Sequence, residues 1–405
     1  MERLYEQLDN IYNEIVDIRR YLHQNPELSF EEVNTSKYIA DYHKQLGHEV
    51  RTGVGGNGVV ATLRGEKSGP TVALRADFDA LPIQEENDTP YKSKVDGVMH
   101  ACGHDGHTAT LLGLAKVLNS MKDEIEGTVV FIHQHAEELP PGGAIAMIED
   151  GCLDGVDVIF GTHLQAQNPL GEIGYRSGAL QAAPDCFDIK IQGKGGHGAS
   201  PHETKDSIAI GGQLISSLQQ IVSRRIDPLD SAVVSVCNFV AKNPYNVIAD
   251  SAVLSGTVRT FKESVRSFIE KEIEKIVKGA CLAADASYTY KYTRGYPATV
   301  NHPEETEFVA DLAKSVPGVK VVREHEPIMA GEDYSYYLQH VKGTYFFTGA
   351  QNPEWEETFP HHHSKFDIDE RALLIAAKVL GKATLTYLKN GSANLKSKES
   401  AVPRS

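Results

Sequence analysis

The chain has 405 residues, of which 41 % are hydrophobic and 23 % charged, so a wholly disordered or collagen-like protein is excluded. Its net charge of −15 repels phosphate backbones, and we expect no nucleic-acid partner. The first twenty residues alternate charged and apolar side chains, and nowhere does the chain offer the roughly 18 apolar residues that a membrane span needs. We therefore expect neither a signal peptide nor a membrane partner.

Five cysteines are widely dispersed, and their number is odd. In a chain of this length the pattern predicts reduced thiols rather than a disulfide framework, and hence a cytoplasmic protein. Four of them are expected to be small buried apolar residues. Cys102 differs because histidines surround it.

The first part of the chain alternates helix and strand. Apolar residues at helical spacing predict helices over 1–22, 29–47 and 107–121. Four runs are nearly continuous in apolar residues and predict buried strands, at 58–65, 71–81, 127–138 and 155–164. Buried strands separated by helices favour an α/β fold with a mostly parallel sheet covered on both faces.

The pattern changes near residue 180. From there the predicted elements are a strand, a helix, two strands, a helix and a strand, at 186–193, 206–225, 231–240, 250–261, 264–284 and 287–296. This βαββαβ order is that of the ferredoxin-like α+β unit.

Helix and strand patterns resume after the insert, so one discontinuous catalytic domain is expected over 1–180 and 295–390. The inserted domain then spans 181–294. The polar, small and basic segment 391–405 is expected to be a disordered tail.

Candidate ligands follow three of the predicted strands. Asp77 and Asp79 end one strand, Glu137 and Glu138 end another, and His163 ends a third. Sites in such sheets form at the carboxyl ends of the strands. Two carboxylates directly after a buried strand are costly unless a metal or other cations compensate them.

Two further clusters are rich in histidine. The segment 99–109 supplies Cys102 and His104 at a predicted loop-to-helix junction, and 360–370 contains three consecutive histidines. Imidazole, thiolate and carboxylate ligands together favour zinc, manganese, nickel or cobalt over magnesium or calcium. The remaining histidines nearby are expected to be loop or supporting residues rather than ligands: His100, His107, His133 and His135.

Seven motifs in this order resemble the aminoacylase, hippurate hydrolase and auxin-conjugate amidohydrolase family, a branch of the co-catalytic metallopeptidases. The resemblance extends from about residue 15 to 385. The motifs are RADFDALP, HACGHDGH, HAEE, GTHL, GKGGHGASPHETKDSI, AGEDYSYYL and HHHSKFDIDE.

The resemblance implies two divalent metal ions per subunit (Mn, Zn, Co or Ni). Cys102 resembles the ligand that bridges them, and Glu137 resembles the general base. The implied remaining ligands are Glu138 and His362 for one ion, and His104 and His163 for the other. His362 is chosen over its two neighbours because the family's ligand lies four residues before the Phe of FDIDE.

Asp77 is expected to orient His104 or another imidazole by hydrogen bonding. Asp105 has the same candidate role, and capping of the helix that follows is an equal alternative.

In the insert, the resemblance implies that His197 holds the scissile carbonyl at a neighbouring subunit's metal site, the alternative being a turn histidine. Asn246 and Arg259 are candidates for binding the substrate's carboxylate or carbonyl. Glu332 belongs to a motif that resembles a pocket-lining loop, and its alternative role is a helix cap.

The implied reaction is hydrolysis of the amide bond of an N-acyl-L-amino acid. Two other hypotheses stay open: a thiol hydrolase that uses Cys102 as nucleophile, and a binding or regulatory protein that has lost its metals. An uncharged strand at 231–240 predicts an exposed sheet edge, and pairing of two such edges predicts a homodimer. The sequence does not specify the acyl group, the amino acid or the native metal.

Overall fold

The computed structural model describes the backbone of residues 1–400 and the side chains of residues 1–390. Within it the chain forms two compact units. The first, called here the sheet unit, comprises Met1–Leu180, Val300–Glu326 and the chain from Asp333 onward. The second, the inserted unit, comprises Gln181–Thr299 and Pro327–Glu332. The segment Pro327–Glu332 lies outside the insert expected from sequence.

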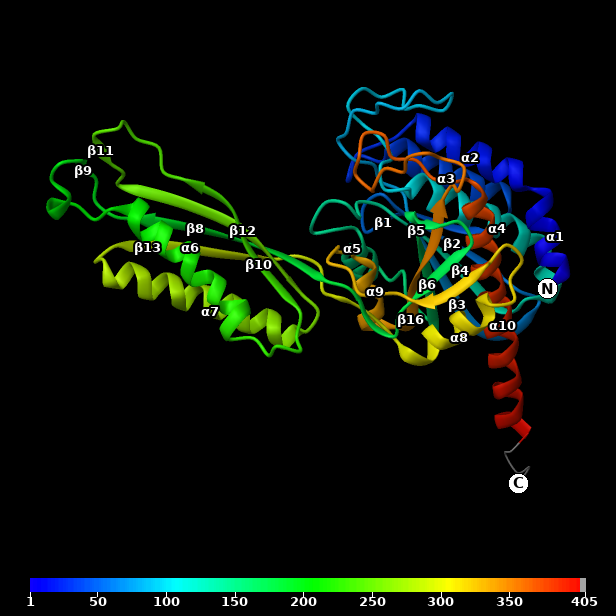
Figure 1. The fold of residues 1–405 in the computed structure, drawn as a ribbon. Coiled ribbons are helices and arrows are strands. Elements are labelled where there is room, and N and C mark those ends of the chain that lie inside the picture. Colours follow the sequence, from blue (N-terminus) through cyan, green and yellow to red (C-terminus); the bar gives the residue numbers. More distant parts are fainter. Residues whose placement is uncertain (401–405) are drawn as a thin grey trace. The chain divides into compact units, whose positions relative to one another are not determined.

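An eight-stranded sheet organises the sheet unit (Figure 1). Its strand order is β1-β2-β4-β3-β5-β16-β6-β15. The strands span Glu49–Val54 (β1), Gly58–Arg64 (β2), Glu126–Gln134 (β4), Lys67–Asp77 (β3), Val158–Pro169 (β5), Lys342–Gln351 (β16), Glu172–Tyr175 (β6) and Val321–Glu324 (β15).

The centre of this sheet is parallel, as the sequence predicts. Strand β3 pairs in parallel with both β4 and β5, and β5 pairs in parallel with β16. The margins are mixed, because β1, β2 and β4 run antiparallel to one another in turn and β6 runs antiparallel to β16. The carboxyl ends of β3 and β4 consequently lie side by side, and β5 runs in the same direction beside β3.

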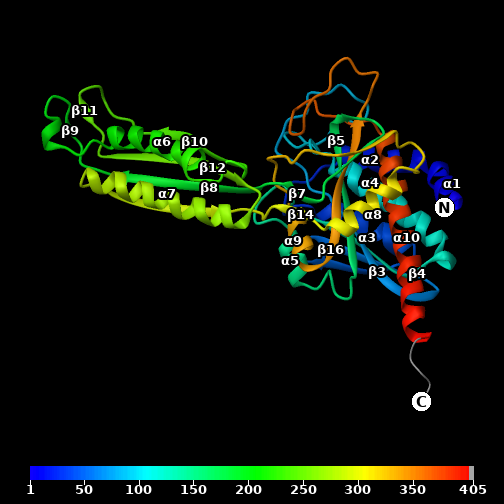
Figure 2. The ribbon, with the colours of Figure 1, turned by 60° about the horizontal axis from the view of Figure 1, so that its bottom comes forward.

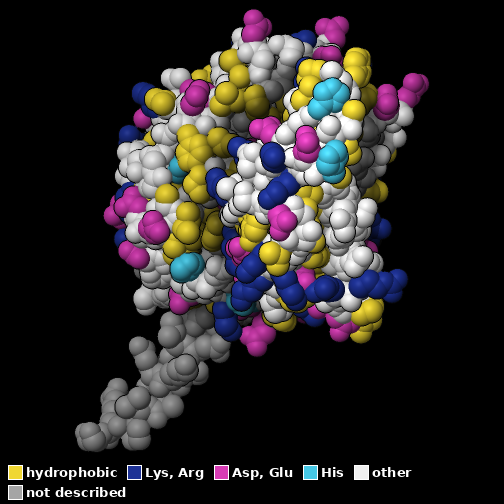
Figure 3. Space-filling model, turned by 90° about the vertical axis from the view of Figure 1, so that its left-hand side faces the viewer, with side chains coloured by type: hydrophobic (Ala, Val, Ile, Leu, Met, Phe, Trp, Pro, Cys, Tyr) yellow, Lys and Arg dark blue, Asp and Glu magenta, His cyan; other side chains and the backbone are white. Residues whose placement is uncertain are grey.

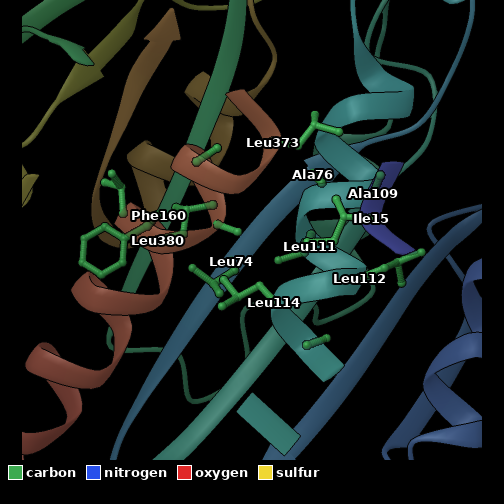
Figure 4. Packing of buried hydrophobic residues seen from close by; sticks show 14 of the residues in the cluster. Ile15, Leu74, Ala76, Ala109, Leu111, Leu112, Leu114, Phe160, Leu373 and Leu380 are labelled. Atoms are coloured by element: carbon green, nitrogen blue, oxygen red, sulfur yellow. The ribbon is translucent and has the colours of Figure 1, made fainter. Parts of the chain in front are cut away.

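Helices cover both faces of the sheet. The larger core lies under α1 (Glu2–Asn10), α2 (Tyr12–Gln24), α3 (Val33–Gln45), α4 (His104–Ser120), α8 (Pro303–Ala313) and α10 (Arg371–Ser400). Figure 4 shows part of it, where Leu111 and Leu114 of α4 lie near Leu74 of β3. Two short helices, α5 (Ala144–Glu149) and α9 (Tyr334–His340), pack on the opposite face with a smaller core.

The inserted unit is the expected βαββαβ fold. Its antiparallel sheet has the order β10-β12-β8-β13, with β10 at one edge. Helices α6 (Ser207–Arg224) and α7 (Glu263–Ala283) pack on one face of this sheet (Figure 2). The strands span Ala183–Gln192 (β8), Ala232–Val240 (β10), Ser251–Thr260 (β12) and Ser287–Arg294 (β13).

The segment Pro327–Glu332 joins the inserted unit through the backbone. The Ala182 amide donates to the Ile328 carbonyl at 3.1 Å, and the Arg259 Nε donates to the Met329 carbonyl at 3.0 Å. Contacts between residues so distant in sequence carry no local pattern, so the sequence did not reveal them.

The expected disordered tail is partly helical. Helix α10 continues to Ser400, so ten residues of the predicted tail belong to it, and the last five lie outside the described residues. Within residues 1–400, each helix is too short or too polar to cross a bilayer. All five cysteines are free thiols, but of the four expected to be buried only Cys152 and Cys281 are, since Cys186 and Cys237 are exposed.

Candidate metal centre

The strand ends of the sheet unit bring the candidate ligands together. Asp77 is the last residue of β3 and is paired in register with Gln134, the last residue of β4. Three residues beyond Gln134 comes Glu137, and His163 lies on β5, the other neighbour of β3. Parallel pairing of β3 with β4 and β5 therefore collects acids and a histidine at one part of the sheet.

Two groups of potential ligands share one cysteine. The first consists of Cys102, His104 and His163, and the second of Cys102, Glu138 and His362. Within each group the ligand atoms lie within 4.8 Å of one another. Cys102 Sγ is 3.5 Å from His163 Nε2, and Glu138 Oε1 is 3.3 Å from His362 Nε2. The geometry thus offers two adjacent three-ligand sites with a common thiol.

Glu137 lies beside both groups. Its Oε2 is 4.0 Å from His104 Nε2, and its side chain is largely buried. It also forms a further potential group with His104 and Glu138. The two adjacent glutamates therefore approach the same imidazole.

Strained backbone turns help to aim two of these segments. Ala136 and His362 have φ angles of 51° and 66°, a left-handed conformation that costs about 1–3 kcal/mol in a non-glycine residue. Surrounding contacts hold both in place. The Ala136 amide donates to Glu32 Oε1 at 2.8 Å, and the His362 amide donates to the Ala101 carbonyl at 2.8 Å. The second bond docks the His362 segment directly beside Cys102.

Only one of the three consecutive histidines reaches Glu138. The Nε2 of His361 bonds to the Leu164 carbonyl at 2.9 Å. His363 stacks on Phe359, and its Nδ1 accepts a hydrogen bond from the Lys365 amide. His362 is therefore the member whose imidazole faces the other ligands.

Hydrogen bonds fix the ring orientation of two candidate ligands. His104 Nδ1 lies 3.1 Å from Asp79 Oδ1, and its buried Nε2 has no hydrogen-bond partner among residues 1–390. His163 Nδ1 donates to the Leu164 carbonyl at 2.9 Å, which leaves Nε2 facing Cys102. Such bonds select the tautomer in which Nε2 can bind a metal.

Asp79, rather than Asp77, orients His104. Asp79 Oδ2 also accepts from the Ser29 hydroxyl and from the Glu138 amide, so this carboxylate holds two ligand segments at once. Sequence reasoning placed Asp79 at the strand end but gave it no role. Its spacing two residues after Asp77 was the available signal.

Asp77 orients the alternative imidazole, His107. Its Oδ1 lies 2.6 Å from His107 Nδ1, whereas His104 Nε2 is 3.8 Å from Oδ2. His107 Nε2 accepts a hydrogen bond from the Leu164 amide at 2.9 Å. Both ring nitrogens of His107 are thus engaged, which agrees with the supporting role expected for it.

Asp105 orients an imidazole, that of His23, and does not take the alternative capping role. It lies inside the first turn of α4, whose N-cap is Gly103, and it does not cap the helix. Its Oδ2 accepts from Arg19 Nε and from His23 Nδ1, each at 2.8 Å. Neither partner belongs to the two ligand groups.

The centre favours positive charge. Burial lowers the pKa of His104, but Asp77 and Asp79 outweigh it and raise this pKa to about 10. The pKa of His163 is lowered well below its ordinary range by burial and by neighbouring histidines. Burial and nearby carboxylates raise the pKa of the Cys102 thiol well above its ordinary range. Cations close to these carboxylates would offset the cost of a thiolate.

The candidates in the inserted unit lie in two places within it. His197 belongs to β9 (Gly196–His197) and pairs with Val247 of β11 (Val247–Ile248), while the Gly198 amide donates to the Asn246 carbonyl at 2.7 Å. His197 and Asn246 are exposed. Arg259, near the opposite end of β12, contacts the segment that contains Glu332, which is 1 % exposed.

Comparison with known proteins identifies the family of the chain. The model of the family described as "Peptidase family M20/M25/M40" matches residues 73–386. "Putative amidohydrolase YhaA" of Bacillus subtilis (strain 168) is 59 % identical over 95 % of this chain and 98 % of its own length. An N-acyl-L-amino acid amidohydrolase of Geobacillus stearothermophilus is 46 % identical over 80 % of this chain and 86 % of its own.

A solved relative has the same fold. The YXEP protein of Bacillus subtilis, described as a dinuclear metal binding peptidase from the M20 family, superimposes with a TM-score of 0.82. It is 36 % identical and covers 94 % of this chain and 99 % of its own. The resemblance drawn from the seven motifs is confirmed, and the chain belongs to peptidase family M20/M25/M40.

Proposed function

We propose that this protein hydrolyses the amide bond of N-acyl-L-amino acids with two divalent metal ions in the sheet unit. One observation carries the proposal: two potential three-ligand groups share Cys102 and lie beside Glu137. The relatives named as amidohydrolases, one of them for N-acyl-L-amino acids, support the reaction class.

The donor set fits manganese, zinc, cobalt or nickel. Thiolate, imidazole and carboxylate ligands suit these metals, and the buried Nε2 of His104, which has no hydrogen-bond partner among residues 1–390, is available to bind one of them. When bound, such ions acidify water and polarise a carbonyl. One thiolate and one carboxylate neutralise only part of the charge of two divalent ions, so the centre would attract an anionic substrate.

Glu137 is the proposed general base. Its carboxylate approaches His104 Nε2 but belongs to neither of the two three-ligand groups. It would take a proton from the attacking water and later deliver it to the leaving amine. Glu138, its neighbour, would instead serve as a ligand together with His362.

His197 is proposed to donate a hydrogen bond to the developing oxyanion. Strand β8 has ten residues and would span roughly 30 Å. His197 lies just beyond its carboxyl end, whereas the chain enters the inserted unit at its amino end. His197 thus lies away from the point where the chain enters the inserted unit, and the motif resemblance supports service at a partner subunit's centre.

A homodimer would provide that partner. Edge strand β10 carries no charged side chain, and its residues Phe239 and Val240 are exposed. The other edge strand, β13, carries Lys291 and Arg294. Charges on an edge disfavour further pairing, so pairing through β10 is the better candidate. A cytoplasmic location remains a prediction from the dispersed, unpaired cysteines.

The first test is metal removal. The protein is dialysed against a chelator, checked by elemental analysis, and assayed for amine release after Mn²⁺, Zn²⁺, Co²⁺ or Ni²⁺ is restored. The substrates are N-acetyl amino acids, benzoylglycine and indole-acetyl conjugates. We expect no turnover without metal and recovery with at least one ion. Full activity in a verified metal-free sample would contradict the proposal and favour the thiol hydrolase.

A further inference from the structure

Arg19 of α2 is a buried cation at the meeting point of three chain segments. Its side chain is fully buried and makes four polar or ring contacts. Nε donates to Asp105 at 2.8 Å, and the two terminal nitrogens donate to Asp367 at 2.7 Å and to Glu370 at 3.2 Å. The guanidinium carbon lies 4.8 Å from the ring centroid of Tyr91.

Two of these partners adjoin ligand segments. Asp105 directly follows His104 in the first turn of α4. Asp367 follows Phe366, whose ring lies 5.0 Å from that of His361, and it comes five residues after His362. The planar guanidinium donates in two directions at fixed angles, so it sets the distance between Asp105 and Asp367.

We propose that Arg19 is a positioning residue of the metal centre: through Asp105 and Asp367 it holds the His104 and His362 segments at the spacing that two metal ions require. The inference rests on the proposed metal centre. Residues that orient ligands from outside the coordination shell commonly change metal affinity by about 10–100-fold. Arg19 would act one step further out, on the backbone segments that carry the ligands.

The adjacent residue provides a matched control. Arg20 donates to both oxygens of Glu370 and lies over the same Tyr91 ring, also at 4.8 Å. Within residues 1–390 its side-chain hydrogen bonds all go to Glu370, and 42 % of its side chain is exposed. Arg20→Lys therefore perturbs the same helix and the same aromatic contact without altering the bonds to Asp105 and Asp367.

The experiment measures zinc affinity directly. Metal-free full-length protein is titrated with Zn²⁺ in competition with a chromophoric chelator, and the thermal midpoint of the metal-free protein is recorded in parallel. Arg19→Lys keeps the charge but loses the planar fork. We expect Arg19→Lys to raise both zinc dissociation constants by about tenfold or more. In Arg20→Lys both constants should stay within about twofold of the wild-type values.

A second variant separates the two segments. Asp367→Asn weakens the anchor on the His362 side only, so we expect one zinc ion to bind less tightly and the other as in the wild type. Asp367→Asn also tests the inference if Arg19→Lys does not fold.

Unchanged constants in folded Arg19→Lys, with only a lower thermal midpoint, would overturn the inference and leave Arg19 a structural residue. If Arg19→Lys does not fold, unchanged constants in Asp367→Asn would overturn it. A wild-type chain that binds no zinc would instead overturn the proposed metal centre, and this inference with it.

Discussion

The two units bury different kinds of side chain. In the sheet unit, acids and histidines lie deep in the protein, among them Asp77, Asp79, His104 and His107. In the inserted unit, His197 and Asn246 are exposed. Figure 3 shows one face of the whole molecule, on which charged, histidine and hydrophobic side chains are intermixed. Several candidate residues of the sheet unit are therefore buried, whereas two candidates of the inserted unit lie at its surface.

The inserted unit does bury one ionic cluster, and its role is structural. Asp185 accepts from two nitrogens of Arg266, at 2.8 and 2.6 Å, from the Tyr292 hydroxyl and from the Gly295 amide. Every donor belongs to the unit itself, and within residues 1–390 Asp185 belongs to no group of potential metal ligands. Burial of charge alone thus does not indicate chemistry. Chemistry is indicated where buried acids orient imidazoles that keep a free nitrogen.

The largest expected effect comes from the proposed general base. Glu137→Gln should retain two metal ions and lower turnover by about 10²–10⁴-fold or more, because proton transfer from water is lost while the ligands stay. Steady-state kinetics and elemental analysis of the same sample test it. Glu138→Gln is the contrast variant and should lose metal. If Glu137→Gln loses metal instead, the roles of the two glutamates are reversed.

The next prediction concerns independence of the units. Asp185→Asn leaves Arg266 without a charged partner in the core, and breaking a buried ion pair commonly costs about 3–5 kcal/mol. We expect the inserted unit to unfold in a separate transition, at a lower temperature than the sheet unit. Calorimetry or hydrogen exchange measures this transition. Zinc affinity of the sheet unit should not change. A single lowered transition together with weaker zinc binding would show that the units are not independent.

His197→Ala is expected to lower turnover by about 10²–10³-fold, as for the loss of one oxyanion donor, with metal content unchanged. His202→Ala is the matched control, because His202 is exposed in the same segment and has no proposed role. An equal loss in both variants would indicate a general disturbance of the segment.

Sharing between subunits can be tested with two inactive proteins. After subunit exchange, a mixture of His197→Ala and Glu137→Gln should regain activity, because one of the two centres in a mixed dimer receives both intact residues. Absence of recovery despite demonstrated exchange would place His197 in its own centre or outside catalysis.

Much of this centre could be predicted because strand ends are local features of the sequence. Apolar runs locate β3, β4 and β5, and the residues that follow them must lie together once the strands are parallel. The motif spacing also selected His362, which the structure brings to Glu138 while His361 and His363 bond elsewhere.

The supporting residues could not be predicted in the same way. Arg19 meets Asp105 across 86 positions and Asp367 across 348, and no local pattern pairs them. The strained φ of Ala136 is equally invisible, since alanine carries no signal for a left-handed turn. Polar composition predicted a disordered end to the chain, yet α10 continues through much of it.

The smallest predicted effect concerns three buried imidazoles of the sheet unit that lie apart from the ligand groups. His43 bonds through Nδ1 to His48 Nδ1 and through Nε2 to His133 Nε2, each at 2.9 Å. Burial lowers the pKa of His48 to about 4 and that of His133 to about 3, and it lowers the pKa of His43 well below its ordinary value.

These three pKa values set the sign of a pH effect on stability. Above about pH 6.5 both the folded and the unfolded chain keep the imidazoles neutral, so they cause no pH dependence there. As the pH falls below that value the unfolded chain binds protons and the folded chain does not. The free energy of unfolding should then fall by about 1.4 kcal/mol per pH unit for each histidine, until the folded-state pKa is reached. His48→Asn should remove one such contribution between pH 7 and 5, measured by urea unfolding, whereas exposed His202→Asn should leave the slope nearly unchanged. An identical slope in wild type and His48→Asn would mean that His48 takes up its proton in the folded chain as easily as in the unfolded one, and that this imidazole cluster is accessible to water.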